Sequence, residues 1–449
     1  MTRQPPTSDS LAGSVPSTAL LTDRYELTML QAALRSGTAH RRSVFEVFAR
    51  RLPEGRRYAV AAGTGRLLED LASFRFGDEQ LSWLSAAGVV DRGTLDWLAG
   101  YRFTGSVRGY AEGECFFPGS PLLVVDGTFA EAVLLETLVL SVLNHDCAIA
   151  AAASRMTSAA GGRPCLEMGS RRTHEDAAVA ASRAAVVGGF EGTSNLEAGR
   201  RYDLSTIGTS AHSFILLHDD ERTAFAAQVA SLGPSTTLLV DTYDVTAGVR
   251  TAVEVAGTGL GAVRLDSGDL LAQAREVRDQ LDSLGARGTR IVVTSDLDEH
   301  AIAALAAGPV DAYGVGTALV TGSGHPTAGL VYKLVAREGP GGDLVSVAKS
   351  SAQKASIGGS KWALRRRDGL GTATQEVVGT GPEPRGRADD RVLHVPLVTH
   401  GEIDERATGP AAVRNAAARH AASRNELPPA ALRLQRGDAA IPTRYEEDP

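Results

Sequence analysis

The sequence predicts an α/β protein in which a parallel sheet, either open or closed into a barrel, follows an α+β region. Three observations predict this class. The 449 residues are 43% hydrophobic and 22% charged, which is typical of a soluble globular chain. A pattern of strand, loop and helix repeats four times between residues 236 and 320. Helices and alternating strands precede these repeats within the first 135 residues.

The charge and the cysteines exclude several kinds of partner and site. A formal net charge of -7 gives no electrostatic reason to expect nucleic acid or an anionic membrane as a partner. Cys115, Cys147 and Cys165 form an odd set without C-x-x-C spacing, which indicates neither a disulfide framework nor a structural zinc site. Residues 1–19 are rich in Pro, Ser and Thr and lack the apolar core of a signal peptide. We therefore expect a flexible tail at 1–19 and a cytoplasmic protein.

Residues 20–135 predict the α+β region. A helical pattern begins near Asp23 and ends just before Gly37. The stretch RSVFEVFARRLPEGRRYAVAAG that follows predicts strand, turn and strand. Alternating apolar residues with Gly and Pro in TGSVRGYAEGECFFPGSPLLVVDG predict a small antiparallel sheet.

The most apolar segment, residues 129–153, predicts a buried helix rather than a membrane span. Leu134, Leu138 and Val142 follow the four-residue step of one helix face. Charges within this segment would be costly in a bilayer. The polar residues that interrupt it are Glu131, Glu136, His145 and Asp146.

The four repeats read TTLLVDTYDV, GAVRLDSGDL, RIVVTSDLDE and DAYGVGTALV. Strands that alternate with helices predict a parallel sheet, and polar residues at the carboxyl ends of its strands line the ligand crevice. We therefore expect Asp241, Asp266, Asp296 and Gly316 to meet at one edge. Beyond residue 340 the pattern is strand-like again, and it ends in a helix, turn and helix at 420–435.

Two of these strand ends suggest a phosphate-binding site. At each of them, packing or helix capping would also explain the residues. Gly314-Val315-Gly316-Thr317 lies between a strand and a helix, where backbone N–H groups bind anions, although a Gly-x-Gly turn also serves packing alone. Arg264, Asp266, Ser267 and Asp269 place one cation and two carboxylates where a sugar phosphate or magnesium would bind. Ser267 or Asp269 would equally cap the next helix. The dinucleotide fingerprint fails because GTGLGA precedes a strand, and the Walker pattern is absent because the chain has no Gly-Lys pair.

Three other features can be explained either by function or by structure alone. The pair Arg171 and Arg172 is either a solvated surface pair or a fork for a carboxylate substrate. His212, in TIGTSAHS, is either a hydrogen-bonded boundary residue or a group that handles phosphate. The chain has only four lysines, all within 29 residues, and a shared phosphate-facing role would explain this clustering. They are Lys333, Lys349, Lys354 and Lys361.

Together the motifs resemble those of nicotinate phosphoribosyltransferases. They occur in the family's order between about residues 20 and 365, and they read LTDRYELTM, GSRRTHEDAAVAASRAAVVGGFEGTSN, GTSAHSF, VDTYD, RLDSGDL, TSDLDE and YGVGTALVT. The resemblance implies an irregular α/β barrel of the type II phosphoribosyltransferase kind at 136–339. It also implies an additional α+β domain, in which a carboxyl-terminal part at 340–449 packs with the amino-terminal part at 20–135.

The resemblance further implies an ATP-dependent, ligase-type enzyme of NAD salvage, which forms nicotinate mononucleotide and pyrophosphate from nicotinate and 5-phosphoribosyl 1-pyrophosphate. ATP would phosphorylate His212, magnesium would act without direct protein ligands, and the active sites would lie at the interface of a homodimer. Tyr25 of the neighbouring subunit would stack on the nicotinate ring. The other nicotinate-binding residues would be Arg171, Ser194, Thr209 and Arg264.

Phosphoribosyl pyrophosphate would bind at the strand ends, where the carboxylate of Asp266 also favours positive charge on the ribose in the transition state. Its implied binding residues are Asp266, Ser267, Gly268, Asp296, Gly314, Gly316 and Thr317. One departure concerns the lysine segment, where the family often has Pro-Gly-Lys-Lys and this chain has Gly358-Gly359-Ser360-Lys361. The residues after 383 carry no motif that can be placed.

Three alternative functions remain. The first is a related transferase for nicotinamide or quinolinate, which Ser194 disfavours because nicotinamide enzymes carry an aspartate there. The second is a barrel lyase or aldolase with a Schiff-base lysine, although no barrel strand before Lys333 contains a lysine. The third is a phosphate-binding protein without catalysis.

Overall fold

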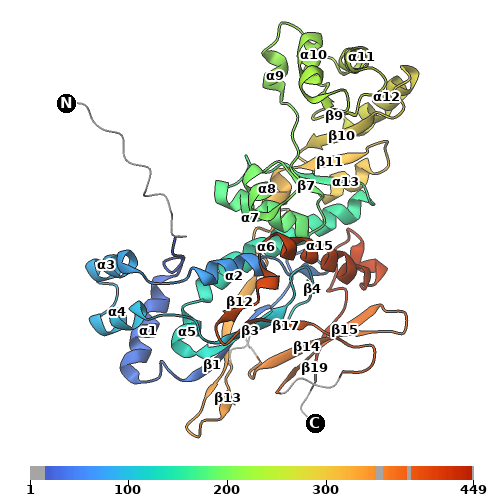
Figure 1. Cartoon of the computed structure of the whole chain (residues 1–449). Helices are drawn as coiled ribbons and strands as arrows, with labels where there is room; N and C mark the ends of the chain where they lie inside the picture. The colour runs from blue at the N-terminus through green and yellow to red at the C-terminus, as the bar shows by residue number, and fades with distance from the viewer. Residues whose placement is uncertain (1–15, 350–356, 382–385, 447–449) are drawn as a thin grey trace, which may run out of the picture.

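Two large sheets, one antiparallel and one parallel, organise the computed structural model of the chain, which describes residues 16–349, 357–381 and 386–446 (Figure 1). The antiparallel sheet lies in the lower half of Figure 1 and the parallel sheet in the upper half, with the long helix α6 (Glu136–Ala160) between them. The expected α/β class with an additional α+β domain is confirmed.

The antiparallel sheet has seven strands among the described residues, in the order β13-β12-β1-β5-β3-β17-β18. It combines three distant parts of the chain, since β12 pairs with β1 and β17 pairs with β3. Its strands are β1 (Arg42–Ala49), β3 (Ser106–Tyr110), β5 (Leu123–Thr128), β12 (Leu330–Glu338), β13 (Leu344–Ser346), β17 (His394–Thr399) and β18 (Glu402–Ile403). The strand Leu330–Glu338, which we expected within the barrel segment, therefore belongs to the α+β domain. A two-residue pairing of β2 (Ala59–Val60) with β4 (Cys115–Phe116) accompanies the sheet.

The helices of the amino-terminal part follow the expected pattern. Helix α1 (Arg24–Ser36) begins after Asp23 and ends at Gly37, whose φ of 73° is the left-handed conformation that glycine adopts at little cost. Helices α2 (Thr64–Ala72), α3 (Asp78–Ala86), α4 (Arg92–Ala99) and α5 (Phe129–Val133) complete this part. Residues 16–19, which we expected in the flexible tail, are ordered: Ala19 is buried, and the Thr18 hydroxyl donates to the carbonyl of Asp70.

Helix α6 is the buried helix that the sequence predicts, although it begins at Glu136, after the separate short helix α5. Its length and composition would allow it to cross a membrane, but 72% of its most apolar window is buried inside the protein. It packs against α2, α7 and α13 and against strands of both sheets. It is therefore the core helix that joins the two halves.

The parallel sheet has the order β7-β6-β11-β10-β9-β8 among the described residues, so it is an open half-barrel. Its strands are β6 (Cys165–Glu167), β7 (Gly192–Thr193), β8 (Thr237–Leu239), β9 (Ala262–Leu265), β10 (Arg290–Ser295) and β11 (Ala312–Val315). The helices around it are α7 (Glu175–Val187), α8 (Leu196–Tyr202), α9 (His212–Leu216), α10 (Glu221–Leu232), α11 (Val245–Ala256), α12 (Leu270–Ser283), α13 (Glu299–Leu305) and α14 (Thr317–Val320). All four predicted strand–helix repeats are present, although the helix after Gly316 has only four residues.

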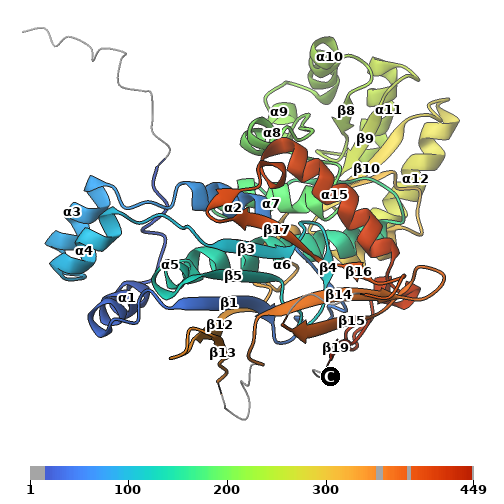
Figure 2. The ribbon, with the colours of Figure 1, turned by 60° about the horizontal axis from the view of Figure 1, so that its bottom comes forward.

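The carboxyl-terminal part contacts both halves. A separate sheet has four strands within the described part of the chain. They are β14 (Lys361–Arg367), β15 (Ala373–Thr380), β16 (Arg391–Val392) and β19 (Thr443–Tyr445). Helix α15 (Gly409–Asn425) packs on α7 and α8 of the half-barrel as well as on α2 and β4 (Figure 2). Short 3-10 helices at Glu405–Ala407 and Pro429–Leu432 flank it.

Candidate active site

The carboxyl ends of the parallel strands bring the predicted polar residues to one edge of the half-barrel. Asp241 follows β8, Asp266 follows β9, Asp296 follows β10 and Gly316 follows β11. This arrangement arises because each strand leads directly into a polar turn, and parallel strands present all these turns at the same edge. The edge therefore collects carboxylates and a glycine turn from four separate repeats.

His212 lies at this edge, as the first residue of α9. Its Nε2 is 4.0 Å from Oδ1 of Asp241 and 3.8 Å from Oδ2 of Asp266. Its Nδ1 is 3.1 Å from the hydroxyl oxygen of Thr242. The imidazole is 40% exposed, whereas the side chain of Asp241 is only 2% exposed. Both ring nitrogens thus face polar groups, and the ring is open to a ligand in solution.

Hydrogen bonds fix the two carboxylates beside His212. Oδ2 of Asp241 accepts from the backbone N–H of Asp266 at 2.7 Å and from the hydroxyl of Ser267 at 3.3 Å. The hydroxyl of Thr294 donates to Asp266. Asp269 caps α12, accepting from a backbone N–H at 3.1 Å, so the capping interpretation is correct for this residue. Asp266 remains half-exposed and available to a ligand.

A cavity of about 520 Å³ is lined by residues of the half-barrel strands, among them Arg264 of β9, and by Thr209 in the loop before α9. Arg264 is half-buried, and its Nε has no hydrogen-bond partner among the described residues. Burial lowers the pKa of this guanidinium, and the positive charge of Arg171 lowers it further. The negative charges of Asp266 and Asp241 act in the opposite direction. A guanidinium that lines a cavity would bind a carboxylate favourably.

Glu167 anchors the neighbouring turns. Its fully buried carboxylate accepts from the N–H of Gly169 and from the hydroxyls of Ser182 and Thr193. Its carbonyl accepts from the N–H of Ser194 at 2.8 Å. These bonds hold Ser194 half-buried at the end of β7, one residue beyond the sheet.

The glycines of the predicted phosphate turn have different surroundings. Gly316 is the N-cap of the one-turn helix α14, and Thr317 is exposed. Gly314 is instead a buried residue of β11: a Cβ there would lie 2.5 Å from a methyl of Thr294 and 2.7 Å from the sulfur of Met168. The packing interpretation therefore applies to Gly314. The other expected phosphate-binding residues lie exposed in turns at the same edge, and they are Ser267, Gly268 and Asp296.

Known proteins are similar to most of this chain. The family description nicotinate phosphoribosyltransferase N-terminal domain matches residues 20–144, and the nicotinate phosphoribosyltransferase family matches residues 164–361. Nicotinate phosphoribosyltransferase pncB1 of Mycobacterium tuberculosis is 57% identical over 434 residues, which cover 95% of this chain and 94% of the relative. The chain belongs to the nicotinate phosphoribosyltransferase family.

Two further nicotinate phosphoribosyltransferases extend the likeness. The enzyme of Bacillus subtilis is 38% identical over 360 residues, which cover 78% of this chain and 73% of the relative. The crystal structure of human nicotinic acid phosphoribosyltransferase matches with a TM-score of 0.81 at 27% identity, over 95% of this chain and 98% of the human chain. The half-barrel and the α+β domain are therefore both features of this family's fold.

Tyr25 is not brought to the site within one chain. It lies on α1, which packs beside the first residues of α6 at the end of the molecule away from β8–β11 (Figures 1 and 2). The side chain is 44% exposed, and burial together with the nearby Glu136 raises the pKa of its hydroxyl to about 12. Its expected contact with nicotinate, which involves a neighbouring subunit, stays a prediction.

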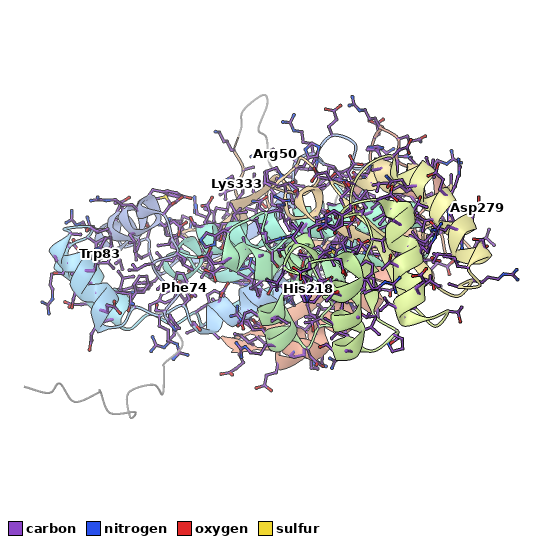
Figure 3. The ribbon with its side chains drawn as sticks, turned by 90° about the horizontal axis from the view of Figure 1, so that it is seen from above. Arg50, Phe74, Trp83, His218, Asp279 and Lys333 are labelled. Carbon is purple, nitrogen blue, oxygen red and sulfur yellow. The ribbon has the colours of Figure 1, made fainter. Side chains whose placement is uncertain are left out.

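Lys333 and Lys361 do not share a phosphate-facing surface. Lys361 is buried and pairs with Glu46 at 2.6 Å, so our expectation is wrong for this residue. Lys333 lies on β12, away from Asp279 of the half-barrel helices (Figure 3), and its Nζ is 3.6 Å from Glu136. Lys354 lies outside the described residues.

Glu221 lies among the acidic residues of the site, and no sequence pattern predicted it there. The sequence shows only a glutamate at the start of a helix, where an acidic residue is common because it complements the helix dipole. In the structure, burial and the negative charges of Asp244 and Asp241 raise the pKa of its carboxyl group to about 7. Among the described residues no group of three or more His, Cys, Asp or Glu could hold a metal ion.

Proposed function

We propose that this chain couples ATP hydrolysis to the synthesis of nicotinate mononucleotide and pyrophosphate from nicotinate and 5-phosphoribosyl 1-pyrophosphate, through a phosphohistidine at His212, in NAD salvage. The observation that carries the proposal is the position of His212. Its imidazole faces Asp241 and Asp266 at the strand edge, and Arg264, which lines the cavity, lies on β9 two residues before Asp266. The half-barrel thus holds a group that can carry phosphate and a pocket for an anionic ring.

Nicotinate binds in the Arg264 cavity in this proposal. The guanidinium of Arg264 and the hydroxyl of Thr209 meet the substrate carboxylate, and the charge of Arg171 adds to the attraction. Ser194 supplies a neutral hydroxyl at the neighbouring strand end. An aspartate in its place would repel nicotinate, so this position favours an acid over an amide substrate.

The transfer step is a displacement at the anomeric carbon of the ribose. The pyridine nitrogen forms the new bond with its lone pair, the bond to pyrophosphate breaks, and pyrophosphate leaves with the electron pair. Positive charge develops on the ribose ring, and the half-exposed carboxylate of Asp266 stabilises it. No proton leaves the nitrogen, so the step needs no general base. Magnesium bound through the phosphates would neutralise charge on the leaving pyrophosphate.

The phosphohistidine forms when an unprotonated ring nitrogen of His212 attacks the γ-phosphorus of ATP. The bond from this phosphorus to the bridging oxygen breaks, and ADP leaves with the electron pair. Thr242 and the two aspartates hold the ring from opposite sides. The phosphoryl group adds about -1.5 to -2 charges, by analogy with other phosphorylated side chains, and so changes the affinity of the edge for anionic substrates and products.

A homodimer in the cytoplasm completes the proposal. Large apolar side chains are exposed near the half-barrel edge, where a partner would cover them. They are Leu196, Leu216, Leu217 and Tyr243. Tyr25 and Met29 on α1 are also exposed, and α1 of a second copy would bring Tyr25 to the nicotinate ring. The three cysteines are free and buried, as a reducing compartment permits.

The test is a direct assay of product. The purified protein is incubated with phosphoribosyl pyrophosphate, magnesium and either nicotinate, nicotinamide or quinolinate, with and without ATP, and nucleotide and pyrophosphate are measured. We expect nicotinate mononucleotide only from nicotinate, faster with ATP. Substrate binding without pyrophosphate release would favour the non-catalytic alternative, and product from nicotinamide or quinolinate at a comparable rate would refute the assigned specificity.

A further inference from the structure

Thr294, a buried residue near the end of β10, donates a hydrogen bond to the half-exposed carboxylate of Asp266. The acceptor is Oδ1, and within the described part of the chain this is the one hydrogen bond that the carboxylate accepts. The other oxygen, Oδ2, is 3.8 Å from Nε2 of His212. The two oxygens of Asp266 therefore have different surroundings: one is held by the sheet and the other faces the site.

The backbone at Asp266 is held separately, by Asp241 at the end of β8. Oδ2 of Asp241 accepts from the N–H of Asp266 at 2.7 Å, and the side chain of Asp241 is only 2% exposed. A fixed backbone still leaves the side-chain torsions of an aspartate free to change. The side chain of Asp266 is 41% exposed, so solvent would allow such rotation. The hydroxyl of Thr294 is the contact that selects one orientation.

The sheet around Thr294 fixes the direction of its hydroxyl. Strand β10 lies between β9 and β11, and Thr294 pairs with Gly314 of β11. On the other side Val293 pairs with Leu265, the residue before Asp266. A Cβ at Gly314 would lie 2.5 Å from the methyl group of Thr294, so this methyl occupies the space that a side chain at 314 would need. Because a β-branched side chain is stiff, the hydroxyl branch is then left for Asp266.

We propose that Thr294 is a positioning residue for Asp266: its hydroxyl holds Oδ1, so that Oδ2 faces the reacting ribose, while Gly314 leaves room for its methyl group. The inference rests on the proposed role of Asp266 in the transfer step. Positive charge develops on the ribose ring, and a carboxylate stabilises this charge best when it is already oriented before the reaction. A carboxylate that first had to rotate into place would stabilise the transition state less.

Two variants of Thr294 test the proposal through the transfer reaction, measured with and without ATP. Thr294→Val keeps the branched shape and removes the hydroxyl. We expect kcat to fall about 10- to 100-fold in both conditions, the effect of losing one hydrogen bond to a charged group, with little change in the KM for nicotinate. Thr294→Ser keeps the hydroxyl and should keep most of the wild-type kcat. If Thr294→Ser instead lost as much kcat as Thr294→Val, the proposal would be overturned.

Thr289, just before β10, provides the matched control. It is 1% exposed, and its hydroxyl donates to the backbone carbonyl of Leu260 at 2.9 Å. Thr289→Val therefore removes a buried hydroxyl of the same kind that has no part in holding Asp266. In urea unfolding both valine variants should lose stability, whereas only Thr294→Val should lose kcat. A similar loss of kcat in both would contradict the proposal, because lower stability alone would then explain it.

Gly314 gives an independent test of the same arrangement. Gly314→Ala brings a Cβ against the methyl group of Thr294, so we expect the hydroxyl to be displaced and kcat to fall. Adding Thr294→Ser removes this methyl group and keeps the hydroxyl, and it should restore part of the lost kcat. A double variant with no more activity than Gly314→Ala would refute the part assigned to Gly314.

A double-variant cycle separates this inference from the proposed role of Asp266. Asp266→Asn should lose kcat by itself, and Thr294→Val should then cost little more, because no carboxylate remains to be positioned. The same loss for Thr294→Val in both backgrounds, or a wild-type kcat in Thr294→Val, would overturn the role of Thr294. A wild-type kcat in Asp266→Asn would instead refute the proposed role of Asp266 in the transfer step, and with it the reason to position this carboxylate.

Discussion

Replacing Lys361 with Met should destabilise the protein strongly and leave phosphoribosyl pyrophosphate binding nearly unchanged. The side chains of Lys361 and Glu46 are 1% and 2% exposed, with Nζ and Oε2 2.6 Å apart. Nζ also donates to the carbonyl of Ile357 at 2.7 Å. Removing one partner of a buried pair costs about 3–5 kcal/mol because it leaves an uncompensated charge. Burial already raises the pKa of Glu46, and Lys361 opposes this effect. Without the lysine, Glu46 will take up a proton, which removes the uncompensated charge and limits the cost. We therefore expect the free energy of unfolding to fall by about 3 kcal/mol.

Urea unfolding measures this fall in the free energy of unfolding, and two further variants identify its cause. Lys333→Met is the matched control: Lys333 is 40% exposed, its partner Glu136 is 3.6 Å away, and such pairs contribute about 0–1 kcal/mol. The double variant Glu46→Leu with Lys361→Met should regain most of the stability, because no buried charge remains. A loss below about 1 kcal/mol in Lys361→Met, together with a KM for phosphoribosyl pyrophosphate raised tenfold or more, would refute the structural role of Lys361.

Three further outcomes follow from the site and the fold. Tyr25→Ala should raise the KM for nicotinate about 2- to 10-fold with little change for phosphoribosyl pyrophosphate, since a lost aromatic stack costs about 0.5–1.5 kcal/mol; equal effects on both would count against stacking. Ser194→Asp should weaken nicotinate binding by charge repulsion, and unchanged affinity in calorimetry would remove Ser194 from the pocket. Burial lowers the pKa of His420 from 6.5 to about 4, so the free energy of unfolding should fall as the pH drops from 6.5 toward 4; His420→Gln should flatten this decline.

The half-barrel was predictable because its signals are local. Each strand, polar turn and helix is contiguous in sequence, so Asp241, Asp266 and Asp296 could be assigned to one edge before any tertiary contact was known. The pairing of β12 with β1 depends on residues almost 300 positions apart, and no local pattern encodes it. For this reason the expected barrel segment, 136–339, wrongly included strand β12.

The charged residues of the site were only partly predictable. Lysine clustering in sequence indicated shared chemistry, yet β14 turns Lys361 toward Glu46 of β1 in the core of the α+β domain. Glu221 carries no sequence signal beyond its place at a helix start. Its burial results from the packing of α10 on α11, where Gly248 leaves room for the carboxyl group. Such properties arise from neighbours, and sequence position alone does not contain them.

The phosphorylation of His212 is the central claim, and the variant His212→Asn tests it most directly. Wild-type and variant protein are incubated with γ-labelled ATP to detect acid-labile phosphoprotein, and with nicotinate and phosphoribosyl pyrophosphate, with and without ATP, to measure transfer. We predict that the variant forms no phosphoprotein and loses ATP stimulation but keeps a slow, ATP-independent transfer, because Asp266 and the Arg264 cavity remain. Acid-labile phosphoprotein in the variant would contradict the account by placing the carrier elsewhere, and complete loss of transfer in a folded variant would mean that His212 serves the transfer step itself.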